Sequence, residues 1–360
     1  MSRLLVGVNG FGRIGRLATR AAFERGEVGR FRAVVDMMPP ESLAQVLRFD
    51  SNHGNFPGHV KTTEGAILVG KDYVFIDGAP NQFRPVDHTI AVMPGQKSPA
   101  DLSWRKFKSE GDKLVVIEST GLFTDAAVAR KHLEAGADWV IISAPATNPD
   151  FTVVVGVNDR ALDFDRHVVV SNASCTTNCL APVADVLQRE FGIRNGRMVT
   201  IHSYTADQPL QDAPHRKEPR RSFAAGLSMV PTTTGAARAV GLVLPELVGK
   251  LDGYAMRVPT PNVSVVDLVL NLVKNATVKD INDALKRASE GIPKVLGYTE
   301  DDVASVVFAH DPRSSIVDAK MTTVADGNLA HVLAWYDNEW GFSNRLVDLI
   351  EKLARYVERS

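Results

Sequence analysis

Asn9-Gly10-Phe11-Gly12-Arg13-Ile14-Gly15-Arg16 is the stretch of sequence that decides the fold. It contains the pattern Gly-x-Gly-x-x-Gly, which directly follows an apolar run at residues 4–8 and opens a helical pattern. A second apolar run at residues 31–35 ends at Asp36. Strand, helix and strand in this order predict a βαβ unit, and a βαβ unit predicts a parallel sheet.

The three glycines and Asp36 predict a dinucleotide site. In this pattern Gly10 makes the tight turn, Gly12 lets the backbone approach a pyrophosphate, and Gly15 allows close packing of helix on strand. Asp36 comes 21 residues after Gly15, where a carboxylate can accept hydrogen bonds from both ribose hydroxyls. An unpaired carboxylate there repels a 2′-phosphate, which favours NAD over NADP. The alternative is a glycine-rich turn that binds nothing, and Asp36 argues against it.

Length and composition limit the class of protein. A chain of 360 residues predicts two domains. A net charge of -1 gives no long-range attraction for nucleic acid or an anionic membrane, so we expect a small partner. The sequence shows no signal peptide and no run of about 18 apolar residues. Only two cysteines occur, which is no disulfide framework, so a reducing, cytoplasmic location is expected.

The pattern of the chain changes near residue 173. Before it, strands and helices alternate, with strands predicted at residues 113–118 and 139–143, a helix at 125–135, and short antiparallel strands and loops at 52–112. After it, we predict a helix from Cys175, an extended loop at 205–223, strands at 256–273 and 329–335, and helices at 278–289 and 346–357. The expected fold class is α/β: a Rossmann-type parallel-sheet domain over residues 1–173, joined by a C-terminal helix at 339–360, and an α+β catalytic domain with a mixed or antiparallel sheet over 174–338.

Cys175 is the candidate nucleophile. It lies in Ser171-Asn172-Ala173-Ser174-Cys175-Thr176-Thr177-Asn178-Cys179, which follows an apolar run and continues into a helix. A helix N-terminus offers unpaired N–H groups and a positive dipole end, which favour thiolate and can hold an oxyanion. Cysteine is more often a small buried hydrophobe, and that interpretation fits Cys179. No metal is expected, because two cysteines at this spacing lack the further ligands that zinc needs.

Three motifs in order resemble the glyceraldehyde-3-phosphate dehydrogenase family. They are the glycine motif at residues 9–16, Ala173-Ser174-Cys175-Thr176-Thr177-Asn178 in the middle, and Trp335-Tyr336-Asp337-Asn338-Glu339-Trp340-Gly341 near the end. The resemblance implies that the Cys175 thiolate attacks an aldehyde, hydride passes to the nicotinamide, and inorganic phosphate cleaves the resulting thioester. It also implies that His202 is the base that takes the hydroxyl proton and holds Cys175 as thiolate.

The same resemblance implies binding residues and partners. The site for the substrate's own phosphate would comprise Thr205, Asp207 and Arg257. The pocket for the attacking inorganic phosphate would comprise Ser174, Thr176, Thr234 and Gly235. The NAD groove would comprise Gly10, Gly12, Arg13, Ile14, Gly15, Asp36, Lys97, Ser119, Ser143 and Asn338. The partners would be a phosphorylated aldehyde and phosphate, and the assembly a homotetramer.

Some positions depart from the family pattern. Members usually carry an arginine eight residues before Pro231, where it helps to bind the attacking phosphate, and this chain has Phe223 there. Arg220 or Arg221 could reach the pocket instead, because the segment between His202 and Pro231 holds one residue more than in many members of the family. Phe342 replaces a common tyrosine, and the chain is longer than usual between about residues 73 and 104.

Two other functions stay open. One is oxidation of another phosphorylated aldehyde, such as erythrose 4-phosphate, with water rather than phosphate releasing the acid; Phe223 favours it and Thr205 argues against it. The other is a non-enzymatic NAD-binding protein, which would have no use for Cys175 and His202. A hydroxy-acid dehydrogenase would share the glycine motif but needs no cysteine.

Overall fold

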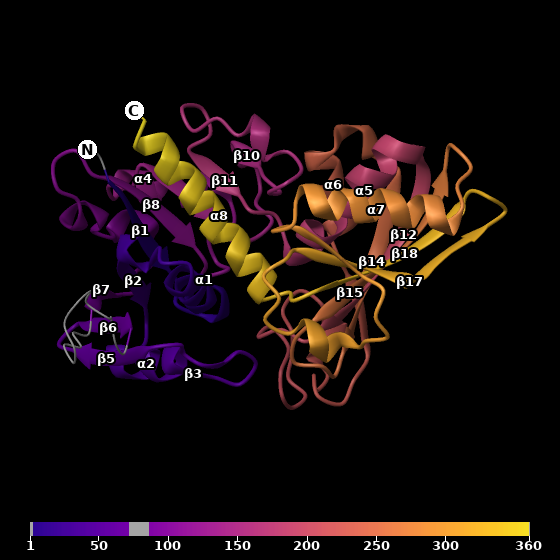
Figure 1. The fold of residues 1–360 in the computed structure, drawn as a ribbon. Coiled ribbons are helices and arrows are strands. Elements are labelled where there is room, and N and C mark those ends of the chain that lie inside the picture. The colour runs from indigo at the N-terminus through magenta and orange to yellow at the C-terminus, as the bar shows by residue number, and fades with distance from the viewer. Residues whose placement is uncertain (1–2, 72–85, 360) are drawn as a thin grey trace, which may run out of the picture. The chain divides into compact units, whose positions relative to one another are not determined.

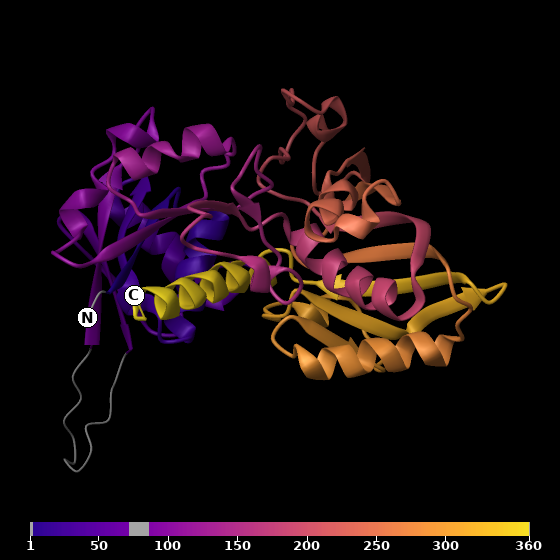
Figure 2. The ribbon, with the colours of Figure 1, turned by 90° about the horizontal axis from the view of Figure 1, so that it is seen from above.

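The computed structural model describes residues 3–71 and 86–359. The chain forms two compact units, each drawn from several segments (Figure 1, Figure 2). The first unit comprises Met1–Phe151, Asp163–Asn172 and Leu346–Ser360, and the second comprises Thr152–Leu162 and Ala173–Arg345. Among the described residues, no helix is both long enough and apolar enough to cross a membrane.

The first unit is built on a nine-stranded sheet with the order β10-β11-β9-β8-β1-β2-β7-β6-β5. The strands from β11 to β7 pair in parallel, and β6 and β5 add antiparallel pairs at one edge. The strands are β1 (Leu4–Asn9), β2 (Phe31–Asp36), β5 (His59–Thr63), β6 (Ala66–Lys71), β7 (Val86–Pro94), β8 (Lys113–Glu118), β9 (Trp139–Ile142), β10 (Phe151–Thr152) and β11 (Val169–Ser171), with a small hairpin of β3 (Phe49–Asp50) and β4 (Gly54–Asn55). The helices are α1 (Arg13–Glu24), α2 (Pro40–Arg48), α3 (Ala126–Ala129) and α4 (Lys131–Glu134).

The predicted parallel sheet is confirmed, with two differences in detail. The helix expected at residues 125–135 is two short helices, α3 and α4, which meet at Arg130. The irregular segment at 52–112 contributes β7, which pairs in parallel with β2, besides the antiparallel strands that were expected. Residues 72–85, which include the first part of the segment thought to be longer than usual, lie outside the described residues.

The second unit holds a seven-stranded mixed sheet with the order β13-β14-β12-β15-β18-β17-β16. Its strands are β12 (Ile193–Ser203), β13 (Val230–Thr233), β14 (Leu251–Val258), β15 (Ser264–Leu272), β16 (Leu296–Thr299), β17 (Ser315–Ala325) and β18 (Leu329–Tyr336). Its helices α5 (Cys175–Phe191), α6 (Ala236–Val243) and α7 (Val278–Gly291) cover one face of the sheet (Figure 1). The mixed sheet was predicted, but the run at 256–273 is two strands, β14 and β15, on either side of the unpredicted β12. The chain ends in α8 (Trp340–Val357).

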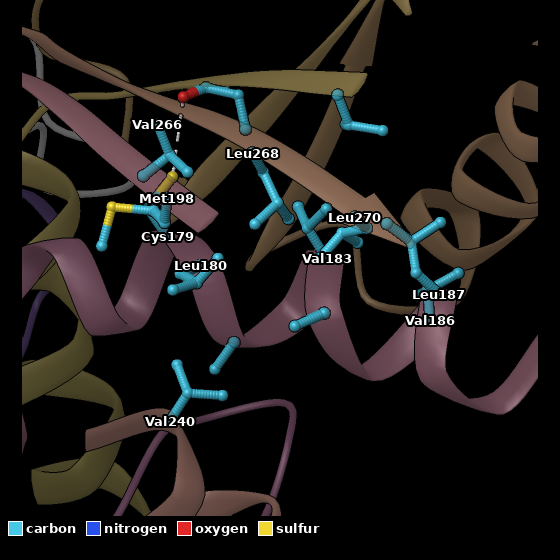
Figure 3. Packing of buried hydrophobic residues seen from close by; sticks show 14 of the residues in the cluster. Cys179, Leu180, Val183, Val186, Leu187, Met198, Val240, Val266, Leu268 and Leu270 are labelled. Carbon is cyan, nitrogen blue, oxygen red and sulfur yellow. Dashed lines mark hydrogen bonds between the residues drawn. The ribbon is translucent and has the colours of Figure 1, made fainter. Parts of the chain in front are cut away.

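Helix α5 is anchored on the sheet by its buried apolar face. Leu180, Val183 and Leu187 are almost fully buried against Met198 on β12 and Leu268 on β15 (Figure 3). Burial of each such leucine contributes about 1.5 to 3 kcal/mol relative to an exposed side chain. The position of the N-terminus of α5, where Cys175 lies, is therefore fixed by packing along the rest of the helix.

The turn between β1 and α1 depends on glycine at two positions. Gly10 has φ of 91°, a left-handed conformation that a residue with a Cβ rarely adopts. A Cβ on Gly15 would lie 2.2 Å from the carbonyl oxygen of Gly10. At Gly12, by contrast, a Cβ would meet nothing within 4 Å. The turn is thus closely packed on the protein side and open at Gly12.

Gly15→Ala is expected to lower the free energy of unfolding by roughly 1 to 3 kcal/mol, because the new methyl group must displace the backbone of the turn. Gly12→Ala is the matched control and should leave stability nearly unchanged, since its methyl group meets open space. Thermal and urea denaturation followed by circular dichroism check both variants. Equal stability of Gly15→Ala and the parent chain would contradict the tight packing described for Gly15.

Candidate active site

The glycine-rich turn, residues 10–15, brings several predicted cofactor residues together in the first unit. The amide of Gly10 donates to the carbonyl of Val35 over 2.9 Å, which ties the turn to β2. At the end of β2, Asp36 accepts from the amide of Phe11 over 2.9 Å. The Ser119 hydroxyl, from the end of β8, donates to the carbonyl of Gly10 over 2.7 Å. Backbone N–H groups at the start of α1 and the open space at Gly12 fit a pyrophosphate.

The other predicted cofactor residues have varied surroundings. Arg13 forms an ion pair with Asp50 over 2.6 Å, so its guanidinium already has a protein partner. Ser143 follows β9, and its amide donates to the carbonyl of Glu118 over 2.9 Å. Ile14 is half-buried on the first turn of α1, and Lys97 is exposed in the loop after β7. Asn338 belongs to the second unit, where it accepts from the hydroxyl of Ser264 over 2.8 Å.

In the second unit, Cys175 is the first residue of α5. Ser174 is the N-cap, and its hydroxyl oxygen accepts from the amide of Thr177 over 3.0 Å, which satisfies one N–H of the first turn. The Cys175 sulfur lies 3.5 Å from Nε2 of His202, which projects from β12. The structure therefore brings together the predicted nucleophile and the predicted base.

Hydrogen bonding fixes which nitrogen of His202 carries the proton. Nδ1 lies 2.7 Å from the carbonyl oxygen of Ser203 and 3.4 Å from Nη1 of Arg257; a carbonyl can only accept and its contact is much the shorter, so Nδ1 is the donor. Burial, together with the positive charge of Arg257, lowers the pKa of His202 to about 3. At neutral pH the imidazole is uncharged, and Nε2 presents a lone pair to Cys175. This is the arrangement of a general base.

The protonation of Cys175 differs from what its helix position alone predicts. Burial raises the pKa of the Cys175 thiol and outweighs the lowering caused by the Arg257 charge and by hydrogen bonds from Thr176 and the backbone. The resting pair is therefore a thiol beside a neutral imidazole. Desolvation, which sequence position does not reveal, is the physical reason.

Arg257, Thr205 and Asp207 form a compact polar group beside this pair. The Arg257 guanidinium, from β14, donates to the Thr205 hydroxyl over 2.8 Å and to the carbonyl of Ser203 over 3.1 Å. The Thr205 hydroxyl in turn donates to Asp207. Burial opposes ionisation of Asp207, but the Thr205 hydroxyl and the charges of Arg257 and Arg221 prevail and lower its pKa. The three residues that were predicted to bind the substrate phosphate thus lie together.

Arg221 is a second arginine at the site. Its Nη1 donates to Asp207, and its Nε donates to the Thr232 hydroxyl over 3.0 Å. The Thr232 hydroxyl donates its own hydrogen bond to Glu218 over 3.0 Å, so its oxygen is free to accept from Arg221. Phe223, by contrast, is 56% exposed. Of the two arginines that the sequence left open, Arg221 is the one whose side chain points to the site, and Arg220 is exposed on the surface.

The predicted residues for the attacking phosphate lie at two helix starts. Thr176, on the first turn of α5, hydrogen-bonds with the hydroxyl of Tyr336 over 2.9 Å. Thr234 accepts from the amide of Ala236 over 3.2 Å, and Gly235 is the N-cap of α6. Both starts offer backbone N–H groups, which suit an anion.

Tyr336 is a buried residue of the site that sequence analysis did not single out. Its hydroxyl bridges Thr176 and Thr200 over 2.9 Å and 2.8 Å, and its ring lies edge-on to the imidazole of His202 with 6.0 Å between centroids. Tyr336 lies inside the Trp335–Gly341 motif, so the motif itself was the available signal.

Comparison with known protein families agrees with this geometry. Residues 4–126 match the family model described as glyceraldehyde 3-phosphate dehydrogenase, NAD binding domain. Residues 174–338 match the model described as glyceraldehyde 3-phosphate dehydrogenase, C-terminal domain. The chain belongs to the glyceraldehyde-3-phosphate dehydrogenase family.

Similar members of the glyceraldehyde-3-phosphate dehydrogenase family match nearly the whole chain. The glyceraldehyde-3-phosphate dehydrogenase of Priestia megaterium is 49% identical over 350 residues, covering 97% of this chain and 98% of that protein. The enzyme of the same name from Mycolicibacterium smegmatis is 51% identical over 351 residues, covering 96% and 97%. Glyceraldehyde-3-phosphate dehydrogenase 1 of Streptomyces avermitilis is 49% identical over 345 residues, covering 96% of each chain. The resemblance seen in the motifs is confirmed.

His202→Asn is expected to lower kcat by about 10²- to 10⁴-fold, the usual contribution of a positioned base. It should also shift the pH dependence of Cys175 alkylation by iodoacetamide to higher pH, because Nε2 no longer accepts the thiol proton. Stopped-flow NADH formation and alkylation rates between pH 6 and 9 check both effects. His310→Asn is the matched control, and an unchanged alkylation profile in His202→Asn would contradict the base role.

Proposed function

We propose that this chain is an NAD-dependent, phosphorylating glyceraldehyde-3-phosphate dehydrogenase. It would convert glyceraldehyde 3-phosphate, NAD and inorganic phosphate to 1,3-bisphosphoglycerate and NADH. The observation that carries the proposal is the Cys175 sulfur 3.5 Å from an unprotonated His202 Nε2, in a chain that matches both family models. A binding protein without catalysis has no need for this pair.

The chemistry follows from the positions of the protons on Cys175 and His202. His202 Nε2 accepts the thiol proton while the Cys175 sulfur bonds to the aldehyde carbon, and it then returns that proton to the carbonyl oxygen, which becomes a hydroxyl. His202 then accepts the hydroxyl proton as that carbon is oxidised, which leaves a thioester on Cys175. NAD, when bound, supplies the hydride acceptor for this oxidation. An oxygen of inorganic phosphate finally attacks the thioester carbon, and the Cys175 sulfur leaves.

The site offers two sets of anion-binding groups, which the Asp207–Arg221 ion pair links. Arg257, Thr205 and Asp207 would bind the phosphate that the substrate carries, since a guanidinium matches phosphate oxygens in pairs. Arg221 would join Ser174, Thr176, Thr234 and Gly235 in binding the attacking phosphate. Its Nε and Nη1 are held by Thr232 and Asp207, and among the described residues no hydrogen bond occupies Nη2. Arg221 would then supply the cation that position 223 lacks, which argues against hydrolysis and an erythrose 4-phosphate substrate.

The remaining parts of the proposal concern the roles of the two domains, the assembly of the chain and its location in the cell. We infer that residues 1–173 with 339–360 bind NAD and that residues 174–338 carry the chemistry. A homotetramer is supported by the exposed apolar side chains of the loop at 205–230, namely Leu210, Phe223, Leu227 and Met229. A cytoplasmic location is supported by two free cysteines, one of which must stay reduced to react.

Omission of phosphate tests the reaction class. With glyceraldehyde 3-phosphate and NAD, steady NADH formation should require inorganic phosphate. Without phosphate, only a burst of about one NADH per site should appear, because the thioester on Cys175 is not released. The spectrophotometric assay at 340 nm measures both. Steady turnover at the same rate without phosphate would favour the hydrolytic alternative, and no burst in either buffer would contradict the dehydrogenase itself.

Arg221→Leu tests the second arginine. Loss of a charge-assisted bond should raise KM for phosphate about tenfold or more and leave the amplitude of the phosphate-free burst unchanged. Phe223→Leu is the matched control and should behave like the parent chain, because leucine keeps an apolar side chain at a position that offers no hydrogen-bond donor to phosphate. If instead Phe223→Leu alters KM for phosphate and Arg221→Leu does not, Arg221 has no part in binding phosphate.

A further inference from the structure

A buried polar network in the first unit has no part in the mechanism above. It consists of Glu118, His132, Trp104 and Asn9, which are 2%, 0%, 0% and 4% exposed. Burial of polar and charged groups is costly unless each is fully hydrogen-bonded. A network of this kind, directly behind a ligand-binding turn, calls for a physical account.

Four elements contribute one residue each. Asn9 ends β1 and Glu118 ends β8, and the two residues are directly paired in the parallel sheet. His132 lies on α4, and Trp104 begins the short 3-10 helix Trp104–Phe107. The indole of Trp104 packs so closely on β1 that a Cβ at Gly7 would lie 2.5 Å from its ring. The network is therefore built into the sheet.

Trp104 dictates the protonation of His132. The indole N–H can only donate, and it lies 3.0 Å from Nδ1 of His132, so Nδ1 is the acceptor. The imidazole proton is then on Nε2, which donates to Oε2 of Glu118 over 3.0 Å. His132 is thus held as one neutral tautomer that points its N–H at the carboxylate.

The Glu118 carboxylate accepts from four donors. Oε2 receives the His132 N–H and the side-chain amide of Asn9, at 2.6 Å. Oε1 receives the amide N–H of Thr120, at 2.9 Å, and the Thr120 hydroxyl. The Thr120 oxygen accepts from the amide of Leu122 over 3.0 Å, so its own proton is free for Glu118. Each oxygen therefore has two donors, and Glu118 is an ionised carboxylate.

The same carboxylate controls the glycine-rich turn. Glu118 holds Asn9, the residue before Gly10, and it holds Thr120 against that glycine: a Cβ on Gly10 would lie 2.7 Å from the Thr120 nitrogen. Between them, Ser119 donates through its amide to the carbonyl of Asn9 over 2.8 Å and through its hydroxyl to the carbonyl of Gly10. Displacement of Glu118 would move both Asn9 and residues 119–120, the two segments that contact the turn.

We propose that His132 and Trp104 are positioning residues for NAD binding. They hold Glu118 correctly oriented, and Glu118 fixes Asn9 and residues 119–120 so that the turn fits the pyrophosphate before NAD arrives. This proposal rests on the NAD binding of the proposed function. It assigns no contact between His132 or Trp104 and the cofactor.

A pair of substitutions at His132 tests the proposal. His132→Ala removes the donor to Glu118 and should weaken NAD binding roughly tenfold, the effect of a lost hydrogen bond to a charged group. His132→Gln keeps an N–H at the Nε2 position and a carbonyl acceptor, so it should stay within about threefold of the parent chain. Isothermal titration calorimetry of the full chain measures the dissociation constant for NAD. The kcat at saturating NAD and the KM for glyceraldehyde 3-phosphate should change less than twofold in both.

Thr120→Val and Thr120→Ser form a second pair in case His132→Ala does not fold. Thr120 is only half-buried, so both should fold, and only the valine should weaken NAD binding. His88→Ala is the control for loss of a partly buried histidine of the first unit that bonds elsewhere, to the carbonyl of Phe31. Unchanged NAD affinity in His132→Ala and Thr120→Val, or equal losses in His132→Ala and His132→Gln, overturns the proposal. A parent chain that does not bind NAD would instead refute the cofactor assignment of the proposed function.

Discussion

The hydrogen bond from Nδ1 of His202 to the carbonyl of Ser203 is the interaction on which the function of the site depends. It commits one nitrogen of the ring as a donor and leaves Nε2 unprotonated beside the Cys175 sulfur. Both partners belong to rigid elements. Cys175 begins a helix whose apolar face is buried, and His202 lies near the end of β12, a strand with neighbours on both sides. The geometry of the pair is therefore set by the core of the second unit and does not rely on a flexible loop.

The charges around the pair explain how a buried base stays neutral. Arg257 and Arg221 both disfavour a proton on His202, and burial acts in the same direction. Asp207 partly offsets the two arginines and orients both of them through Thr205 and its own carboxylate. The site thus carries an excess of positive charge, which suits two phosphate groups, and a base that is unprotonated at neutral pH. The same burial keeps the thiol protonated at rest, so the base has a proton to take.

Much of this could be predicted from the sequence because it is encoded locally. The βαβ unit, the glycine turn, Asp36 and the helix that begins at Cys175 each follow from a short pattern with a definite physical cause. The features that the sequence did not predict depend on contacts with distant parts of the chain. Strand β12 went unpredicted because its residues at 193–203 mix polar and apolar side chains, and pairing on both edges stabilises it. The choice between Arg220 and Arg221 depended on where a loop folds back onto Thr232 and Asp207, which residue spacing did not determine.

Helix α8 has a consequence for how the chain folds during synthesis. The boundary between the two units falls within α8, and residues from Leu346 onward belong to the first unit. There Leu346, Leu349, Ile350 and Leu353 are buried, and Asp348 and Glu351 form ion pairs with Arg25 on α1. The first unit therefore needs residues that are synthesised after the whole of the second unit. A nascent chain that has already made every strand of the first sheet still lacks this cover, so the first unit reaches its final form only after the residues of the second unit have been synthesised.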